Sequence, residues 1–378
     1  MMRVMPDIRP YHIDVPDAVL DDLKQRLSRT RWPEAETVDD WSQGIPLAYT
    51  RELADYWANG YDWRSREIVL NRFDHFLTEI DGLDVHFIHQ RSPHDDALPL
   101  LITHGWPGSV VEFHKVIEPL VNPPSGRPED AFHVICPSLP GYGFSGKPTG
   151  AGWGVEKIAE AWERLVGRLG YDRYGAQGGD WGAAVTTQIG RNRGRCVGIH
   201  LNMPMAKPVA GSGELSEDDQ QALAAYADHR KWGTGYSKQQ STRPQTLGYG
   251  LVDSPVGQLA WIVEKFWAWA DCDGHPEKVF SRDELLDNVM LYWVTGSGAS
   301  SARLYWESFN KFVGDDRVEL PTGVASFPKE ILRTPRSWCE EAYNIRHWTT
   351  MPRGGHFGAF EQPEWFVDDV RTFFSTLR

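Results

Sequence analysis

The chain has 378 residues, which is enough for one large α/β domain with an insertion or for two ordinary domains. Hydrophobic residues make up 41% and charged residues 24%, as in an ordinary globular protein, and the net charge is −13. Because this charge repels phosphate backbones and anionic lipids, it argues against a nucleic acid or an anionic membrane as partner and leaves a small neutral molecule as the simplest ligand.

The cysteines and the N-terminus predict a soluble, cytoplasmic protein with no membrane anchor. No C-x-x-C pair is present, so neither a zinc site nor a disulfide framework is expected. Residues 1–10 carry charges and prolines where a signal peptide is apolar, and no apolar run approaches the roughly 18 residues of a membrane span. Neither a metal nor a cofactor is expected. The cysteines are Cys136, Cys196, Cys272 and Cys339.

The first 75 residues are predicted to be helical and irregular. Pro16 suits a first helical turn, and the apolar residues that follow it fall on one helix face, namely Val19, Leu20, Leu23 and Leu27. From about residue 76 short apolar strands alternate with helical stretches such as 155–169; the strands are 76–80, 83–89, 100–103, 132–137 and 171–177. This alternation predicts an α/β fold whose mostly parallel sheet has helices on both faces.

The strand at 100–103 ends in a turn, His104-Gly105-Trp106-Pro107-Gly108-Ser109. Such a turn can aim backbone N–H groups at one point. His104 is a possible acid–base group, but a histidine beside a glycine turn more often braces the loop by hydrogen bonding.

Asp180 lies in the segment GGDWG (residues 178–182), which has the spacing of a nucleophile elbow with a carboxylate in place of serine. A serine attacking a saturated carbon would form a stable ether, whereas an aspartate forms an ester that water can cleave. The spacing therefore indicates an electrophile other than an ester. The alternative is a glycine-rich loop in which Asp180 only caps a helix.

After residues 202–204 the strand pattern stops, and a helical block is predicted to about residue 313. Ser216 and Ser281, each followed three residues later by an acidic residue, indicate helix N-termini. A helical insertion between core strands would cover the carboxyl edge of the sheet, where ligands bind. Its tryptophans either line an aromatic pocket or pack in its core; they are Trp261, Trp267, Trp269 and Trp293.

Two further strands, 324–327 and 345–351, precede Glu330 and His356. The chain order nucleophile, acid, histidine is that of the α/β-hydrolases, so Glu330 would orient the His356 ring and stabilise its imidazolium form. In hydrolases with this elbow, the oxyanion hole takes one N–H from the residue after the nucleophile and one from an earlier loop, here Trp181 and Trp106.

Together, these motifs resemble the microsomal-type epoxide hydrolase family, and the resemblance covers nearly the whole chain. The matching segments are HGWP (104–107), SLPGYGFS (138–145), GGDWG (178–182), DSPVG (253–257), NVMLYW (288–293), FPKE (327–330) and RGGHF (353–357). The N-terminus departs from the membrane-anchored members of that family.

The resemblance implies a nucleophile, Asp180, a general base, His356, and its carboxylate partner, Glu330. It also implies two lid tyrosines that hold the epoxide oxygen, Tyr236 and Tyr305. The implied division is an N-terminal meander that wraps the core (1–75), an α/β-hydrolase core (76–205 and 316–378) and a helical lid (206–315).

The function expected is hydrolysis of an epoxide to a vicinal diol through an Asp180 ester, with a small-molecule epoxide and water as partners. A haloalkane dehalogenase is the main alternative, because it uses the same ester chemistry and often has a tryptophan after its nucleophile. An idle, ligand-binding hydrolase scaffold is another. A detoxifying and a biosynthetic role both fit, and a homodimer is possible.

Overall fold

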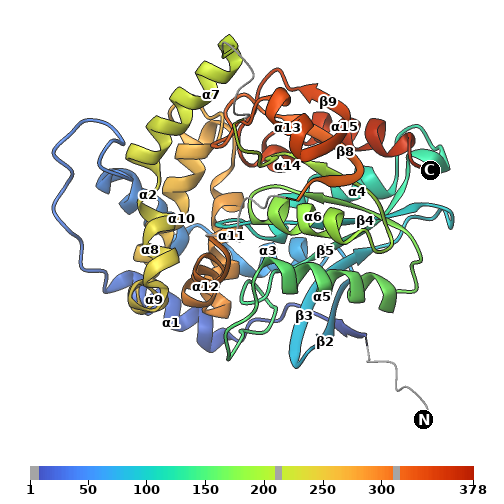
Figure 1. Ribbon diagram of the computed structural model, residues 1–378. Helices are drawn as coiled ribbons and strands as arrows, with labels where there is room; N and C mark the ends of the chain where they lie inside the picture. Colours follow the sequence, from blue (N-terminus) through green and yellow to red (C-terminus); the bar gives the residue numbers. More distant parts are fainter. Residues whose placement is uncertain (1–7, 209–214, 310–315) are drawn as a thin grey trace.

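The computed structural model describes residues 8–208, 215–309 and 316–378 (Figure 1). A nine-stranded sheet with the order β1-β2-β3-β5-β4-β6-β7-β8-β9 forms its centre. The strands are β1 (Arg9–Tyr11), β2 (His75–Ile80), β3 (Leu83–Gln90), β4 (Leu98–Thr103), β5 (Phe132–Pro137), β6 (Tyr174–Gly178), β7 (Cys196–Leu201), β8 (Val318–Ser326) and β9 (Tyr343–Thr350).

The sheet is mostly parallel, as predicted. Strands β4 to β9 pair in parallel, while β1, β2 and β3 form an antiparallel edge that joins the rest through β5. The carboxyl ends of β4, β6, β8 and β9 therefore meet at one edge of the sheet, and the loops that follow them carry the candidate catalytic residues.

Two strands escaped prediction. β1 has three residues, is largely exposed and exists only because it pairs with β2, so its local sequence carries no strand signal. β7 is interrupted by Gly198 and His200, which break the apolar pattern although the whole strand lies inside the sheet. β8 also begins earlier than predicted, at Val318, because sheet pairing extends it past Pro321.

Helices cover both faces of the sheet (Figure 1). α5 and α6 pack together over one face, and α4 and α15 cover the other. Amphipathic spacing explains α5, in which Ile158, Trp162 and Leu165 are fully buried. The core helices are α4 (Ile117–Val121), α5 (Val155–Arg168), α6 (Trp181–Asn192), α13 (Arg336–Ala342), α14 (Gly358–Glu361) and α15 (Pro363–Ser375).

Between β7 and β8 the chain forms a helical insertion, defined here as α7 to α12. Both predicted helix starts are confirmed, because Ser216 and Ser281 each form a capping box with the acidic residue three positions later. The insertion comprises α7 (Glu217–Asp228), a π-helical turn (His229–Gly233), α8 (Gly235–Thr242), α9 (Pro244–Asp253), α10 (Pro255–Trp269), α11 (Arg282–Thr295) and α12 (Gly298–Ser308).

The N-terminal segment, residues 8–74, runs beside this insertion (Figure 1). It contains α1 (Asp17–Ser28), α2 (Leu47–Asn59) and α3 (Trp63–Leu70), and the predicted face of α1 buries Leu23 and Leu27. Arg66 and the Tyr61 hydroxyl both bind Asp287 of α11, which ties the segment to the insertion. The predicted starting residue 1 and the predicted lid end at residue 315 lie outside the described residues.

Candidate active site

Asp180 occupies a tight turn between β6 and α6. Its backbone has φ 51° and ψ −128°, a conformation that residues with a Cβ rarely adopt. A Cβ atom on Gly178 would lie 2.2 Å from the Gly182 carbonyl oxygen, and one on Gly182 would lie 1.8 Å from that of Thr103. The positions two residues before and two residues after Asp180 therefore accept only glycine, and the strained turn presents the carboxylate at the carboxyl edge of the sheet.

The loop after β4 donates a backbone hydrogen bond to Asp180. The Trp106 N–H lies 2.8 Å from Asp180 Oδ1. Gly105 allows this approach, because a Cβ atom there would lie 2.2 Å from the same oxygen. Trp181, the other predicted oxyanion donor, is the first residue of α6 and directly follows the carboxylate.

His356 lies between Asp180 and Glu330. Its Nε2 atom is 3.4 Å from Asp180 Oδ2, and its Nδ1 atom is 2.6 Å from Glu330 Oε1. Glu330 follows β8 and His356 follows β9, and the parallel pairing of these strands brings the two loops together. The structure therefore brings together the three residues that the sequence placed in a triad, all of them buried.

Two opposing effects set the protonation of His356. Burial disfavours the imidazolium, but the charge of Glu330 and the contacts with Asp180 outweigh burial, so the pKa of His356 lies well above its usual value. The contacts with Asp180 and Glu330 therefore favour the protonated form of the His356 ring.

Glu361, which sequence reasoning missed, fixes the loop that carries His356. Its carboxylate accepts hydrogen bonds from the N–H groups of Gly355 at 2.9 Å, Phe357 at 2.9 Å and Asp271 at 2.8 Å. Burial nevertheless raises the pKa of Glu361 to about 7. In the sequence, only its place five residues after His356 marks Glu361, and that does not distinguish it from other acidic residues near the C-terminus.

The helical insertion places Tyr236 and Tyr305 together above this site. Tyr236 comes from α8 and Tyr305 from α12, and their ring centroids are 5.8 Å apart. The Tyr236 ring stacks on Trp106 at 5.1 Å, and the Tyr305 ring meets Trp181 edge-on at 4.8 Å. Burial, strengthened by the Asp180 charge, raises the pKa of both phenols, so they stay protonated at neutral pH.

The tryptophans of the insertion, predicted either to line a pocket or to pack in its core, fall into two pairs with different neighbours. Trp269 packs edge-on against His356, with ring centroids 5.0 Å apart, and Trp261 contacts Trp106 at 6.5 Å. Trp267 and Trp293 instead pack against tryptophans of the N-terminal segment. Two therefore border the site, and two join the insertion to that segment.

His104 braces the loop after β4. Its Nδ1 atom lies 2.9 Å from the Gly105 carbonyl oxygen, and its Nε2 atom accepts a hydrogen bond from the Leu139 N–H at 3.2 Å. Burial lowers the pKa of His104 to about 4, so the ring is neutral. Both ring nitrogens are engaged with the backbone, which supports the bracing role.

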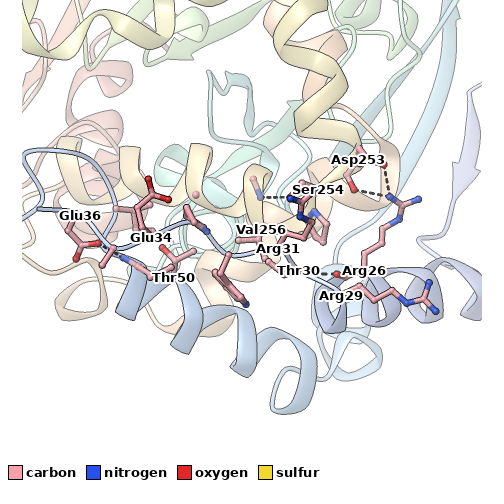
Figure 2. A pocket seen from close by; sticks show the side chains of 18 of the residues that line it. Arg26, Arg29, Thr30, Arg31, Glu34, Glu36, Thr50, Asp253, Ser254 and Val256 are labelled. Atoms are coloured by element: carbon pink, nitrogen blue, oxygen red, sulfur yellow. Dashed lines mark hydrogen bonds and ion pairs between the residues drawn. The ribbon is translucent and has the colours of Figure 1, made fainter.

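Two hollows lie in very different places. A surface hollow of about 1050 Å³ lies between the N-terminal segment and the α9–α10 junction. Arg26 and Asp253, which bind each other, are among the residues that line it (Figure 2). None of the predicted site residues lines it. A much smaller cavity borders Asp180 and His356, and Glu112, which sequence reasoning also missed, lines it. Of the two hollows, the small cavity is therefore the one that borders the candidate nucleophile and base.

The structure also bears on metal binding, on membrane-spanning helices and on the state of the cysteines. Within the described ranges, no three His, Cys, Asp or Glu side chains are grouped so as to hold a metal ion. Among the same residues, every helix is too short or too polar to cross a bilayer. All four cysteines are buried free thiols.

Comparisons with known proteins agree with this geometry. A family profile described as "Epoxide hydrolase N terminus" matches residues 8–113, and one described as "alpha/beta hydrolase fold" matches residues 99–229. A Stigmatella aurantiaca protein, named as an inferred epoxide hydrolase, is 52% identical over 98% of this chain and 86% of its own length.

Two solved structures share the complete architecture. The juvenile hormone epoxide hydrolase of the silkworm Bombyx mori has a TM-score of 0.92 and 32% identity, over 99% of this chain and 95% of that one. The Aspergillus niger epoxide hydrolase has a TM-score of 0.90 and 33% identity, over 98% and 97%. With its elbow aspartate, its paired tyrosines and this similarity along its whole length, the chain belongs to the epoxide hydrolase family and has the α/β-hydrolase fold.

Proposed function

We propose that this enzyme opens an epoxide through a covalent ester on Asp180 and then hydrolyses that ester to release a vicinal diol. The observation that carries the proposal is the position of Asp180, with one carboxylate oxygen held by the Trp106 N–H and the other facing His356. The two oxygens therefore have different environments. This difference suits an ester mechanism, in which one oxygen attacks the substrate and the other becomes the carbonyl oxygen of the ester.

In the first half-reaction Oδ2 of Asp180 attacks one epoxide carbon, and the bond from that carbon to the epoxide oxygen breaks. The paired phenols of Tyr236 and Tyr305 donate hydrogen bonds to the alkoxide that develops. Their raised pKa values keep both protons available at neutral pH. The helical insertion thus acts as the lid that supplies the acid groups.

Ester formation prepares the second half-reaction. It neutralises Asp180 and so removes one of the charges that raise the pKa of His356. The proton of His356 then passes by way of the phenols to the alkoxide formed from the epoxide oxygen. His356 is thereby left as the base that activates water, while Glu330 keeps the ring oriented. Water attacks the ester carbonyl carbon, and the Trp106 N–H, with that of Trp181, stabilises the oxyanion on Oδ1.

The dehalogenase alternative fits the site less well. A halide leaves as a stable anion and needs only N–H donors, whereas an alkoxide needs a proton donor. Two buried phenols beside the Trp106–Trp181 pair serve an alkoxide. The intact contacts of His356 with Asp180 and Glu330 likewise argue against an idle scaffold.

The aromatic surroundings also bear on the substrate and the location. The rings of Trp106, Tyr236 and Trp269 pack against one another, and the Trp106 N–H binds the nucleophile, which favours an epoxide with apolar substituents. The buried free cysteines support the proposed cytoplasmic location, where thiols stay reduced. The homodimer and the biological role stay predictions.

The test is His356→Gln, which removes the base but leaves the nucleophile. The ester should form and persist, so intact mass spectrometry after mixing with substrate should show the protein plus one substrate mass, with the adduct on Asp180. His12→Gln, which changes an exposed histidine in the N-terminal segment, should turn over normally. Full turnover by His356→Gln, or an adduct on another residue, would show that these roles are wrong.

A further inference from the structure

The small cavity beside Asp180 and His356 has room for the centre of about one water molecule, at about 10 Å³. Residues from β4, β6 and the loop before α4 line it, including Thr103, Gln177 and Glu112, whereas Tyr236 and Tyr305 do not. The cavity is therefore separate from the phenols that face the epoxide oxygen.

Unpartnered polar atoms surround this cavity. Gln177 is 1% exposed, and its Nε2 group is fixed by a 2.8 Å hydrogen bond to Asn202, while its Oε1 atom has no hydrogen-bond partner among the described residues. Thr103 Oγ1 is likewise buried without a partner in the part of the chain that the structure describes. Buried polar groups normally find partners, so these atoms indicate a polar ligand.

Glu112 adds a carboxyl group to the same cavity. Its side chain folds back over the loop after β4, where a Cβ atom on Gly108 would lie 1.4 Å from Glu112 Oε1. Gly108 therefore leaves the space that this carboxyl occupies. Burial raises the pKa of Glu112 to about 8. The charge of His356 lowers this pKa and that of Asp180 raises it, but burial is the larger effect, so the neutral form of the group is favoured at physiological pH. A neutral carboxyl adds no repulsion beside the oxyanion of Asp180.

We propose that Glu112 and Gln177 bind the water molecule that hydrolyses the Asp180 ester. One water proton faces His356 Nε2, and the other is held by Gln177 Oε1 or by the Glu112 carboxyl oxygen. A lone pair on the water oxygen is then left to attack the ester carbonyl carbon. Glu112 is thereby a catalytic residue of the second half-reaction alone, and the inference rests on the ester mechanism proposed above.

The chemical step balances without a further reactant. The water oxygen bonds to the Asp180 carbonyl carbon while His356 Nε2 takes a proton. The tetrahedral intermediate then breaks the bond between that carbon and the diol oxygen, and the proton passes from His356 to the departing alkoxide. The second water proton then passes from Asp180 to His356, so Asp180 regains its carboxylate with one oxygen from water and His356 regains its proton, while Glu112 keeps its proton throughout.

The test compares the two half-reactions in Glu112→Leu, Glu112→Gln and Gln177→Met. Stopped-flow tryptophan fluorescence and quenched mass spectrometry would give the rates of ester formation and ester hydrolysis. Glu112→Leu and Gln177→Met should slow hydrolysis about 10–100-fold, so that the ester accumulates, and leave its formation within about twofold. Glu112→Gln, which keeps a neutral acceptor, should retain most of the hydrolysis rate. Glu118→Leu, a matched change at an exposed position nearby, should alter neither rate.

Each result decides between the two proposals. Ester that forms and is hydrolysed at the wild-type rate in both Glu112→Leu and Gln177→Met would overturn the water site alone. Equal slowing of both half-reactions would also overturn it, because it would show that these side chains only maintain the structure of the site. If no ester forms even in His356→Gln, the covalent mechanism itself fails. If Glu112→Leu does not fold, the rates of Gln177→Met alone test the water site.

Discussion

At the scale of single residues, the burial of the two phenols sets their chemistry. Tyr236 and Tyr305 lie on different helices, yet their rings pack within 5.8 Å of each other and against Trp106 and Trp181. Apolar surroundings disfavour phenolate, so each hydroxyl remains a donor. Two donors at one point can share the alkoxide, and each can partly replace the other.

Tyr236→Phe and Tyr305→Phe should therefore each slow ester formation about 10-fold, and the double variant should lose about 10²–10⁴-fold. The fold should survive, because each change removes only a hydroxyl. Pre-steady-state quenching of tryptophan fluorescence would follow ester formation directly. The assignment is wrong if the double variant opens epoxides at the wild-type rate. It is equally wrong if the wild type releases halide from haloalkanes faster than it hydrates any epoxide.

At the scale of elements, α11 holds the loop that positions the Trp106 N–H. The Asn288 amide donates to the Pro107 carbonyl at 2.8 Å and accepts from the Ser109 hydroxyl at 2.7 Å. The Tyr292 hydroxyl donates to the Gly108 carbonyl at 2.7 Å. One helix of the insertion thus binds three successive residues beside the nucleophile, two through their backbone carbonyls and Ser109 through its hydroxyl.

Tyr292→Phe should leave the buried Gly108 carbonyl without this donor and cost about 1–3 kcal/mol of unfolding free energy. Because the loop also carries the Trp106 N–H, ester hydrolysis should slow several-fold. Urea unfolding and single-turnover kinetics would measure the two effects. Tyr249→Phe, at a tyrosine of α9 that is 71% exposed, is the matched control. Wild-type stability and rate in Tyr292→Phe would show that α11 does not support the loop.

At the scale of the whole molecule, a buried charge cluster joins the far side of the sheet to its last helix. Asp369 of α15 accepts from His200 of β7 at 2.8 Å and from His347 of β9 at 2.7 Å. Burial alone would raise the pKa of Asp369, but these hydrogen bonds outweigh it and hold the pKa well below the usual range. A lowered pKa stabilises the fold above the unfolded value of 3.8, and the contribution is lost as the pH falls below it.

Asp369→Asn should therefore lower the unfolding free energy at pH 7 by about 2–3 kcal/mol, and the deficit should shrink towards pH 3. Urea unfolding at both pH values would measure it. Asp368→Asn, whose side chain is 76% exposed next in the chain, should have little effect at either pH. A deficit that is the same at both pH values would mean that packing, and not the ionised carboxylate, provides the stability.

The sequence by itself was sufficient to predict the architecture and the candidate triad. Local signals were sufficient where the residues of a short segment themselves favour its conformation. Examples are the small residues around Asp180, the glycines before His356, the apolar strands and the serine caps. Chain order then predicted which loops meet, because the carboxyl ends of parallel strands share one edge. Tyr236 and Tyr305 depended on a family resemblance, since neither spacing nor residue type distinguishes them from other tyrosines.

Only the tertiary structure decided which remote groups surround the candidate catalytic residues. β1 and β7 exist through pairing with neighbours, and a three-residue or glycine-broken strand has no pattern of its own. Glu112 and Glu361 acquire raised pKa values only because folding removes them from water beside Asp180 and His356. Burial and the distance between charges are properties of the packed chain, so neither quantity exists in the sequence until the strands and the helical insertion are assembled.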